Sequence, residues 1–319
     1  MSYPEPLEFN KLSTYSVHDR FSKVTVDHFA KPLATGASLL DYLNALPQQF
    51  AGVDFPELID RLAVSHTGGH PIYIGMGAHV IKVGMNPILI DLMQQGLIQG
   101  IALNGAGIIH DTEIAMVGRT SEDVGLVLDD GAFGAAKETG EVVNGAIIKG
   151  AENGLGLGQA MGKYLNEQDF AFNDVSLLAM AYKLDVPVTV HVAVGTDIVH
   201  IHPSANGAAI GATSHRDFKL FCRLVSKLDQ GAYLNLGSAV LLPEVFLKAI
   251  TVVRNLGHTV SQFTTANFDF IRHYRTMVNV VNRPTATGGK GYNFIGHHEL
   301  MIPLLAIALK EAVAERQSN

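Results

Sequence analysis

The stretch Ile101–Gly118, IALNGAGIIHDTEIAMVG, decides the fold. It opens on the apolar run Ile101–Leu103, which is typical of a buried parallel strand. Small residues at 104–107 interrupt the run, the polar residues HDTE follow at 110–113, and a helix-like stretch over 114–117 closes the unit. Open α/β sheets bind nucleotides where a strand ends in glycines before a helix, because backbone N–H groups approach phosphates there. The stretch therefore predicts a nucleotide-binding strand–turn–helix unit.

Composition indicates a compact protein with a large core. Of the 319 residues, 47% are apolar and 17% charged, and 32 are glycine, which suits many strand-to-helix turns. We predict one domain over 1–319, with 1–30 as an irregular N-terminal arm. The net charge of −7 and the lack of a basic stripe argue against a nucleic-acid partner. The single Cys222 excludes an intramolecular disulfide.

The location expected from the sequence is cytoplasmic. The first ten residues, MSYPEPLEFN, have neither a basic region nor an apolar run of the kind that starts a secretory signal. No uninterrupted apolar stretch approaches the ~18 residues that a membrane-spanning helix needs. We therefore expect no membrane partner.

Strands and helices alternate along the chain. Strands are predicted at 71–76, 101–103, 187–194, 231–236 and 260–265, and helices at 38–46, 55–63, 86–95, 175–184, 217–228, 243–255 and 299–315. This alternation predicts a Rossmann-like α/β fold, with a mostly parallel sheet and helices on both faces. The long segment 195–213, rich in His, Asp, Asn and Gly, is typical of a functional or mobile loop.

Six blocks of sequence carry a resemblance to a known family. They are PIYIGMGAHVIKVG (71–84), ALNGAGIIHDTE (102–113), VPVTVHVAVGTDIVHIH (186–202), GAYLNLGSAVLLPE (231–244), FTTANFDF (263–270) and GHHELMIPLL (296–305). In this order and spacing the chain resembles the deoxyhypusine synthase family. The HDTE turn followed by GRTS at 118–121 is also similar to the archaeal NAD-dependent ornithine cyclodeaminases, which share that fold.

The resemblance implies NAD as cofactor and a homotetramer with NAD sites at subunit interfaces. The residues it places against NAD are Gly75, Gly77, Ala78, His79, Gly105, Ala106, Gly107, Asp111, Asp197, Gly237, Thr265, Ala266, His297 and His298. The family's triple-glycine turn keeps only Gly237 here, and its Thr-Ser-Asn turn is replaced by residues 77–79.

The sequence offers two candidate catalytic residues, of which the resemblance implies Lys290. Lys290, in GGKGY, stands where the family has a lysine that forms an imine with the oxidised substrate. The alternative is a solvated lysine in a glycine-rich loop. His110 is a candidate base or substrate-orienting group, and the alternative is a histidine that is hydrogen-bonded beside the turn.

Acidic and histidine residues supply further candidates. Asp111 and Glu113 are suited to hold a ribose hydroxyl or a substrate group, although carboxylates at this place also complement a helix dipole. His200 and His202 lie on one face of an extended segment and are predicted to contact substrate. With Asp197 they would form a zinc-like set, but we predict no metal.

The main departure from the family lies between Asp269 and Lys290. There the family grips a polyamine with carboxylates, whereas this chain has no acid and carries Arg272 and Arg275. Arginine binds carboxylates and phosphates well, so an anionic or zwitterionic, amino-acid-like substrate is expected. The alternative is a solvated basic loop.

The sequence leads to one favoured function and two alternatives. The favoured function is an NAD-dependent enzyme that transiently oxidises a small amine or amino-acid-like substrate before group transfer, elimination or cyclisation. One alternative is a deoxyhypusine or homospermidine synthase that acts on a polyamine. The other is a non-catalytic regulator that binds NAD or another nucleotide.

Overall fold

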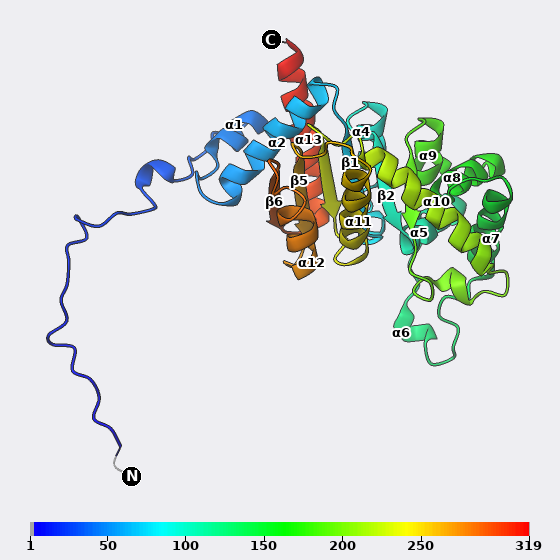
Figure 1. The fold of residues 1–319 in the computed structure, drawn as a ribbon, viewed down its shortest axis with the longest axis horizontal. Helices are drawn as coiled ribbons and strands as arrows, with labels where there is room; N and C mark the ends of the chain where they lie inside the picture. Colours follow the sequence, from blue (N-terminus) through cyan, green and yellow to red (C-terminus); the bar gives the residue numbers. More distant parts are fainter. Residues whose placement is uncertain (1–2, 319) are drawn as a thin grey trace. The chain divides into compact units, whose positions relative to one another are not determined.

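The structure, a computed structural model, describes residues 3–318 and contains one six-stranded parallel sheet (Figure 1). The strands are β1 (Ile72–Met76), β2 (Gly100–Asn104), β3 (Val188–His191), β4 (Ala232–Leu236), β5 (Thr264–Asp269) and β6 (Lys290–Ile295). Their order is β3-β2-β1-β4-β5-β6, and every neighbouring pair is parallel. This is the strand order of dinucleotide-binding α/β folds, in which ligands bind at the carboxyl ends of the strands where the order reverses. Here the order reverses between β1 and β4.

Helices cover both faces of the sheet, which confirms the predicted fold class (Figure 1). They are α2 (Ala51–Thr67), α3 (His79–Lys82), α4 (Asn86–Gln94), α5 (Gly105–Val117), α6 (Val124–Val127), α7 (Lys137–Glu152), α8 (Leu157–Gln168), α9 (Leu177–Lys183), α10 (Gly207–Val225), α11 (Leu241–Asn255), α12 (Tyr274–Thr276) and α13 (His298–Ser318), with the short turns η2 (Asn173–Val175), η3 (Ile198–Ile201) and the π-helical η4 (Met277–Asn282). On one face Tyr233 stacks on Phe246 of α11, and Phe221 of α10 joins the same core. On the other face α5 packs on β2 and α13 on β5.

Contacts divide the chain into two compact units after Val53. The first unit contains η1 (Val26–His28) and α1 (Leu39–Ala45). The helix α1 begins as predicted, because the Ser38 hydroxyl accepts from the Asp41 N–H and the Asp41 carboxylate accepts from the Ser38 N–H. The second unit starts at Asp54 and holds the whole sheet. Among the described residues no helix is both long and apolar enough to cross a membrane.

Three predicted elements are corrected by the structure. The helix α5 begins at Gly105, so the expected glycine turn is the first helical turn and the HDTE residues lie inside the helix. The fifth strand runs from Thr264 to Asp269, four residues later than predicted. The strand β6 was not predicted at all, and the helix α10 takes over part of the expected loop 195–213.

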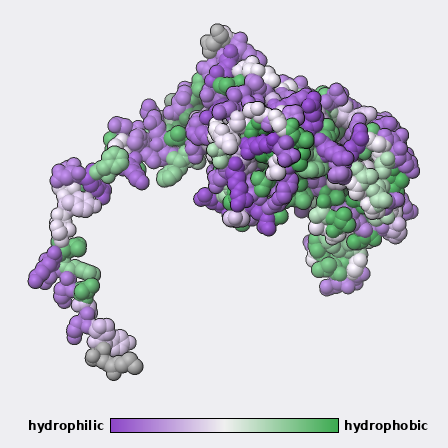
Figure 2. Space-filling view, in the orientation of Figure 1, coloured by the Kyte–Doolittle hydropathy of each residue, from purple (hydrophilic) through white to green (hydrophobic). Residues whose placement is uncertain are grey.

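The short helix α6 carries an exposed apolar surface. Val124, Leu126 and Leu128 are all exposed, and Leu126 is 78% exposed. Figure 2 shows this green patch on the part of the molecule that α6 forms. The helix begins at Asp123, whose carboxylate accepts from the Gly125 N–H at 3.0 Å.

Candidate functional site

Two glycines meet at the point where the strand order reverses. Gly77 follows β1, and its N–H donates to the Leu236 carbonyl at 3.0 Å. A Cβ on Gly77 would lie 2.5 Å from the carbonyl oxygen of Gly237, which follows β4. Gly237 itself has a φ of +66°, a left-handed conformation that favours glycine. Gly77 is itself buried, so the two strand ends meet backbone to backbone at this switch point, which is where folds of this strand order have their ligand crevice.

The imidazole ring of His298 packs directly on Gly237. A Cβ on Gly237 would lie 2.6 Å from Cε1 of His298, the first residue of α13. The His298 ring is buried, and its centroid is 5.7 Å from that of His79 and 4.8 Å from that of Phe270. The ring centroid of His297 lies 5.3 Å from that of the same Phe270. The structure thus brings together the predicted residues Gly77, His79, Gly237, His297 and His298.

Two members of this cluster, Asp269 and Phe270, were not predicted as site residues from the sequence. They lie at the end of β5, which was predicted to stop at Thr265. Asp269 is 6% exposed, and its Oδ2 has no hydrogen-bond partner in the described chain. Nε2 of His273 lies 3.8 Å from this atom. Burial and the neighbouring His298 lower the pKa of His79, so its imidazole is neutral near pH 7.

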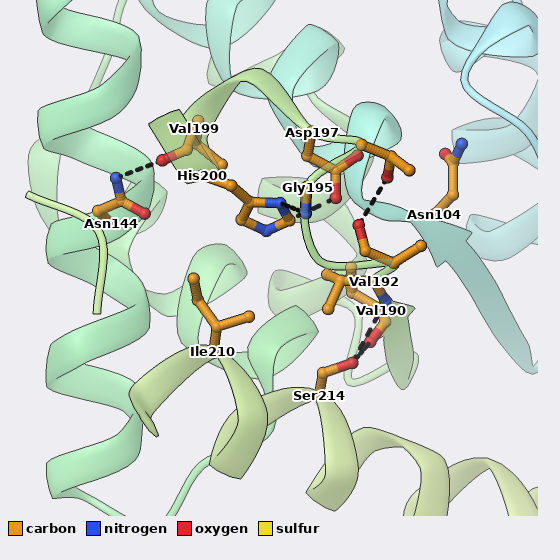
Figure 3. Close-up of polar contacts among 12 residues, drawn as sticks. Asn104, Asn144, Val190, Val192, Gly195, Asp197, Val199, His200, Ile210 and Ser214 are labelled. Atoms are coloured by element: carbon orange, nitrogen blue, oxygen red, sulfur yellow. Dashed lines mark hydrogen bonds and ion pairs between the residues drawn. The ribbon is translucent and has the colours of Figure 1, made fainter. Parts of the chain in front are cut away.

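A second group of residues surrounds the N-terminus of α5 (Figure 3). The Asn104 side chain accepts from the Gly107 N–H at 3.0 Å and caps the helix. The Asp197 carboxylate occupies the space beside Gly105 that a side chain would fill. Burial raises the pKa of Asp197, while the nearby His200, the Thr196 hydroxyl and the Ala106 N–H lower it. Its Oδ2 has no hydrogen-bond partner among the described residues, and Nε2 of His200 lies 3.8 Å away.

The segment that carries Asp197 is fixed to α7. The Asn144 amide donates to the Val199 carbonyl and to the Ser204 hydroxyl, both at 3.0 Å. Nδ1 of His200 accepts from the Gly195 N–H at 3.1 Å (Figure 3). The ring of His202 packs on Gly140, where any Cβ would collide with it. The two histidines predicted to bind substrate therefore hold this segment in place.

Asp111 is not available to a cofactor, contrary to the prediction. It is completely buried and its oxygens accept four hydrogen bonds. The donors are the Asn86 amide (2.7 Å), the Ser176 hydroxyl (2.6 Å), and the N–H groups of Leu177 (2.8 Å) and Leu178 (2.9 Å). Asp111 thus ties α5 to the N-terminus of α9, because the predicted turn is a helix and its second turn faces the core.

His110 and Glu113 form a separate polar chain on α5. Nδ1 of His110 lies 2.7 Å from the Thr120 hydroxyl, which donates to Glu113 at 2.5 Å. Glu113 also accepts from Thr139 at 3.0 Å, and it lines a pocket of about 600 Å³. Burial lowers the pKa of His110. These contacts join α5 to the segments on either side of α6.

Lys290 lies at the opposite edge of the sheet from the crevice. It is the first residue of β6, so it is found at the amino ends of the parallel strands. Its ammonium is 2.6 Å from both carboxylate oxygens of Glu57 on α2. This ion pair lowers the pKa of Glu57. The structure of one chain therefore does not bring Lys290 together with the cofactor candidates.

Three more predicted cofactor contacts lie inside the sheet. A Cβ on Gly75 would collide with the hydroxyl of Tyr233, so this glycine makes room for a core side chain. Thr265 and Ala266 are completely buried, and the Thr265 hydroxyl donates to the Val280 carbonyl at 2.9 Å. The four-residue shift of β5 moves both residues from the expected strand end into the strand itself.

The basic segment after β5 is partly neutralised. Nε of Arg275 lies 3.3 Å from a carboxylate oxygen of Glu244 on α11. Arg272 is exposed on the short connection between Phe270 and α12. Of the two arginines predicted to bind substrate, Arg272 is the one next to the Phe270 cluster. No three His, Cys, Asp or Glu residues within 3–318 are grouped so that they could hold a metal ion.

Comparison with known proteins agrees with this fold. No family model and no curated protein matches the chain. A Methanococcus maripaludis S2 protein described as a "conserved putative LOR/SDH protein" is similar in structure, with 16% identity over 80% of this chain and 70% of that chain, and a TM-score of 0.51. AgrE, solved in a ternary complex with ornithine and NAD+, has 14% identity and a TM-score of 0.52 over 82% of this chain and 33% of its own.

A third structure aligns with most of the chain at a lower TM-score. A "putative deoxyhypusine synthase" from Entamoeba histolytica aligns at 11% identity and a TM-score of 0.49, over 86% of this chain and 93% of that chain. The chain spans about a third of AgrE. At these identities the likeness shows a shared fold. The protein is therefore an α/β protein with the dinucleotide-binding strand order, and its fold is found in an enzyme solved with NAD+.

Proposed function

We propose that the protein is an NAD-dependent enzyme that binds its cofactor along the carboxyl edge of the sheet and acts on an amino-acid-like substrate. One observation carries the proposal. The strand order reverses between β1 and β4, and at that point Gly77 and Gly237 follow the carboxyl ends of the two strands. Folds with this order bind dinucleotides across that crevice.

The residues along the crevice fit such a ligand. At one end, the unpaired Oδ2 of Asp197, beside the N-terminus of α5, offers an acceptor suited to a ribose hydroxyl. At the other end, the rings of His79 and Phe270 offer flat surfaces suited to an aromatic base. Bound there, NAD would supply a hydride acceptor.

The substrate class follows from two charged residues, Arg272 and Asp269, beside the cluster of aromatic and imidazole rings around Phe270. Arg272 is exposed next to Phe270 and is free to bind a carboxylate, whereas the buried carboxylate of Asp269 suits an amino group. The AgrE structure, in which ornithine is bound together with NAD+, supports a substrate of this type. We propose transient oxidation followed by group transfer, elimination or cyclisation, in a cytoplasmic homotetramer.

Calorimetric titration of the purified protein with NAD tests the proposal. We expect the wild type to bind NAD, and Asp197→Asn to bind at least about tenfold more weakly because a charged acceptor for a hydroxyl is lost. Asp129→Asn, an exposed site, is the matched control and should bind like the wild type. The proposal fails if the wild type does not bind NAD.

Substrate class is tested next by NAD reduction, followed through the absorbance of NADH. L-ornithine, other amino acids and the polyamine spermidine are compared at equal concentration. We expect reduction with an amino acid, and a higher KM in Arg272→Ala, because Arg272 would hold the carboxylate. Activity with spermidine alone would favour the polyamine-specific alternative instead.

A further inference from the structure

The hydrogen bond of one buried histidine fixes the position of its proton. Nε2 of His298 lies 3.1 Å from the carbonyl oxygen of Phe268. A carbonyl only accepts hydrogen bonds, so Nε2 must carry the proton. In the neutral ring Nδ1 then carries a lone pair, which makes it an acceptor and a base.

This base is unpaired although it is buried. Nδ1 of His298 has no hydrogen-bond partner within the described chain, and the side chain is 0% exposed. A buried acceptor without a partner is costly, so proteins usually satisfy it with protein, water or ligand. The unpaired Nδ1 can therefore accept a hydrogen bond from a ligand donor.

The position of the His298 ring is set by Gly237. His298 lies on Gly237, where a Cβ would be 2.6 Å from Cε1, so only glycine at 237 leaves room for the imidazole. Its ring neighbour Phe270 is itself partly exposed. Because His298 is buried, a ligand would have to displace a neighbour such as this ring to reach it.

From this geometry we propose that His298 is the proton acceptor of the oxidation step, and that Nδ1 takes the proton from the substrate's amino or hydroxyl group. The inference rests on the proposed function, which supplies NAD as oxidant. The substrate C–H bond breaks and its electron pair leaves as hydride to NAD. The N–H or O–H bond breaks, its pair forms the C=N or C=O bond, and the proton goes to Nδ1.

The charged groups that act on the neighbouring His79 are Lys82, Asp269 and Glu299. The Phe268 carbonyl, bonded to Nε2 of His298, keeps the ring oriented for return of the proton.

The variant His298→Gln tests whether His298 acts as a base or only has a structural role. The glutamine amide can still donate to the Phe268 carbonyl, but it provides no base. We expect NAD affinity within about threefold of the wild type and a kcat at least about 100-fold lower with the best amino acid found, the size of a general-base contribution. The exposed His215→Gln on α10 is the control and should match the wild type.

A second measurement does not depend on turnover. In nitrogen NMR spectra of full-length protein with isotope-labelled histidine, we expect a ring signal with Nε2 protonated and Nδ1 unprotonated that is absent from His298→Gln and is shifted by NAD with L-ornithine. A protonated Nδ1, or full activity of His298→Gln, overturns the role of His298. Absence of NAD binding to the wild type instead contradicts the proposed function itself.

Discussion

The carboxylate of Asp197 lies in the space that a side chain on Gly105 would occupy. Gly105 begins α5 at the end of β2, and Asp197 comes from the segment after β3. The absence of a side chain at 105 therefore lets a carboxylate reach a helix N-terminus, where the partial positive charge favours an anion.

The first prediction concerns this contact. In Gly105→Ala the new methyl group must displace Asp197, so we expect the unfolding free energy to fall by about 1–3 kcal/mol and NAD affinity to fall with it. Urea denaturation and calorimetry measure the two effects. Gly145→Ala is the control because a Cβ there meets nothing within 4 Å, and in α7 it should stabilise by about 0.5–1 kcal/mol. Equal behaviour of the two variants would contradict the assigned contact.

Asp111 should be essential for stability and dispensable for binding. Asp111→Ala leaves the donors of Asn86, Ser176, Leu177 and Leu178 without their acceptor. We expect a loss of about 3 kcal/mol or more in unfolding free energy, because buried unpaired donors cost about 1–3 kcal/mol each. Asp91→Ala, which breaks the half-exposed pair with Lys310, should cost less than about 1 kcal/mol.

The NAD affinity of folded Asp111→Ala separates the two interpretations of this residue. We expect it to lie within about twofold of the wild type, measured under conditions where thermal scans show the variant to be folded. A selective loss of NAD binding without loss of stability would restore the cofactor role that the sequence suggested.

Asp217 should make stability depend on pH. This buried side chain of α10 accepts from the N–H groups of Gly158 and Val190, and burial raises its pKa to about 7. Because the folded pKa exceeds the unfolded value, the native state binds the proton more tightly. This stabilisation is complete below about pH 3.8 and is lost as the pH rises through about 7.

The size and the test of this effect follow from linkage. The shift corresponds to an upper limit of about 4 kcal/mol. We expect the unfolding free energy of the wild type, minus that of Asp217→Asn, to decrease from about pH 4 to about pH 8, since the amide does not titrate. The exposed Asp129→Asn should follow the wild type at every pH. A constant difference between the wild type and Asp217→Asn would show that the carboxyl group does not titrate in this range.

The fold could be predicted from the sequence because its signals are local. Buried parallel strands such as Ile101–Leu103 are continuous apolar runs, and glycines mark their ends. The strand β5 was misplaced because its second half contains Asn267 and Asp269, whose polar groups look unsuited to a buried strand. Asn267 is paired with Asn235 and Asn293 of neighbouring strands at 2.8 Å, contacts that only the assembled sheet provides.

The site was predicted only in part for the same reason. His79, Gly237 and His298 were predicted from the resemblance, which places all three against NAD. Asp269 and Phe270 were missed once β5 had been placed too early. Asp111 was misassigned because a carboxylate that binds a ribose and one that caps a helix look alike in sequence, and only the four donors around it distinguish them.

Lys290 provides the sharpest test of the resemblance to deoxyhypusine synthase. In this structure its ammonium is held by Glu57 at the amino edge of the sheet, away from the crevice. We therefore expect Lys290→Ala to change NAD affinity and kcat by less than about threefold. The pair is partly exposed, so the loss of stability should stay below about 1 kcal/mol.

The matched control is Glu57→Ala, which removes the same ion pair from the other side. If the pair is only structural, both variants should behave alike in calorimetry, in urea denaturation and in the NAD-reduction assay. Loss of turnover in Lys290→Ala alone, with NAD binding retained, would instead show that the amine takes part in chemistry. Because Lys290 lies far from the crevice of its own chain, that outcome would require it to serve the crevice of a second copy. Titrating inactive Lys290→Ala with inactive His298→Gln would then restore activity in mixed assemblies, whereas a structural lysine predicts no such rescue.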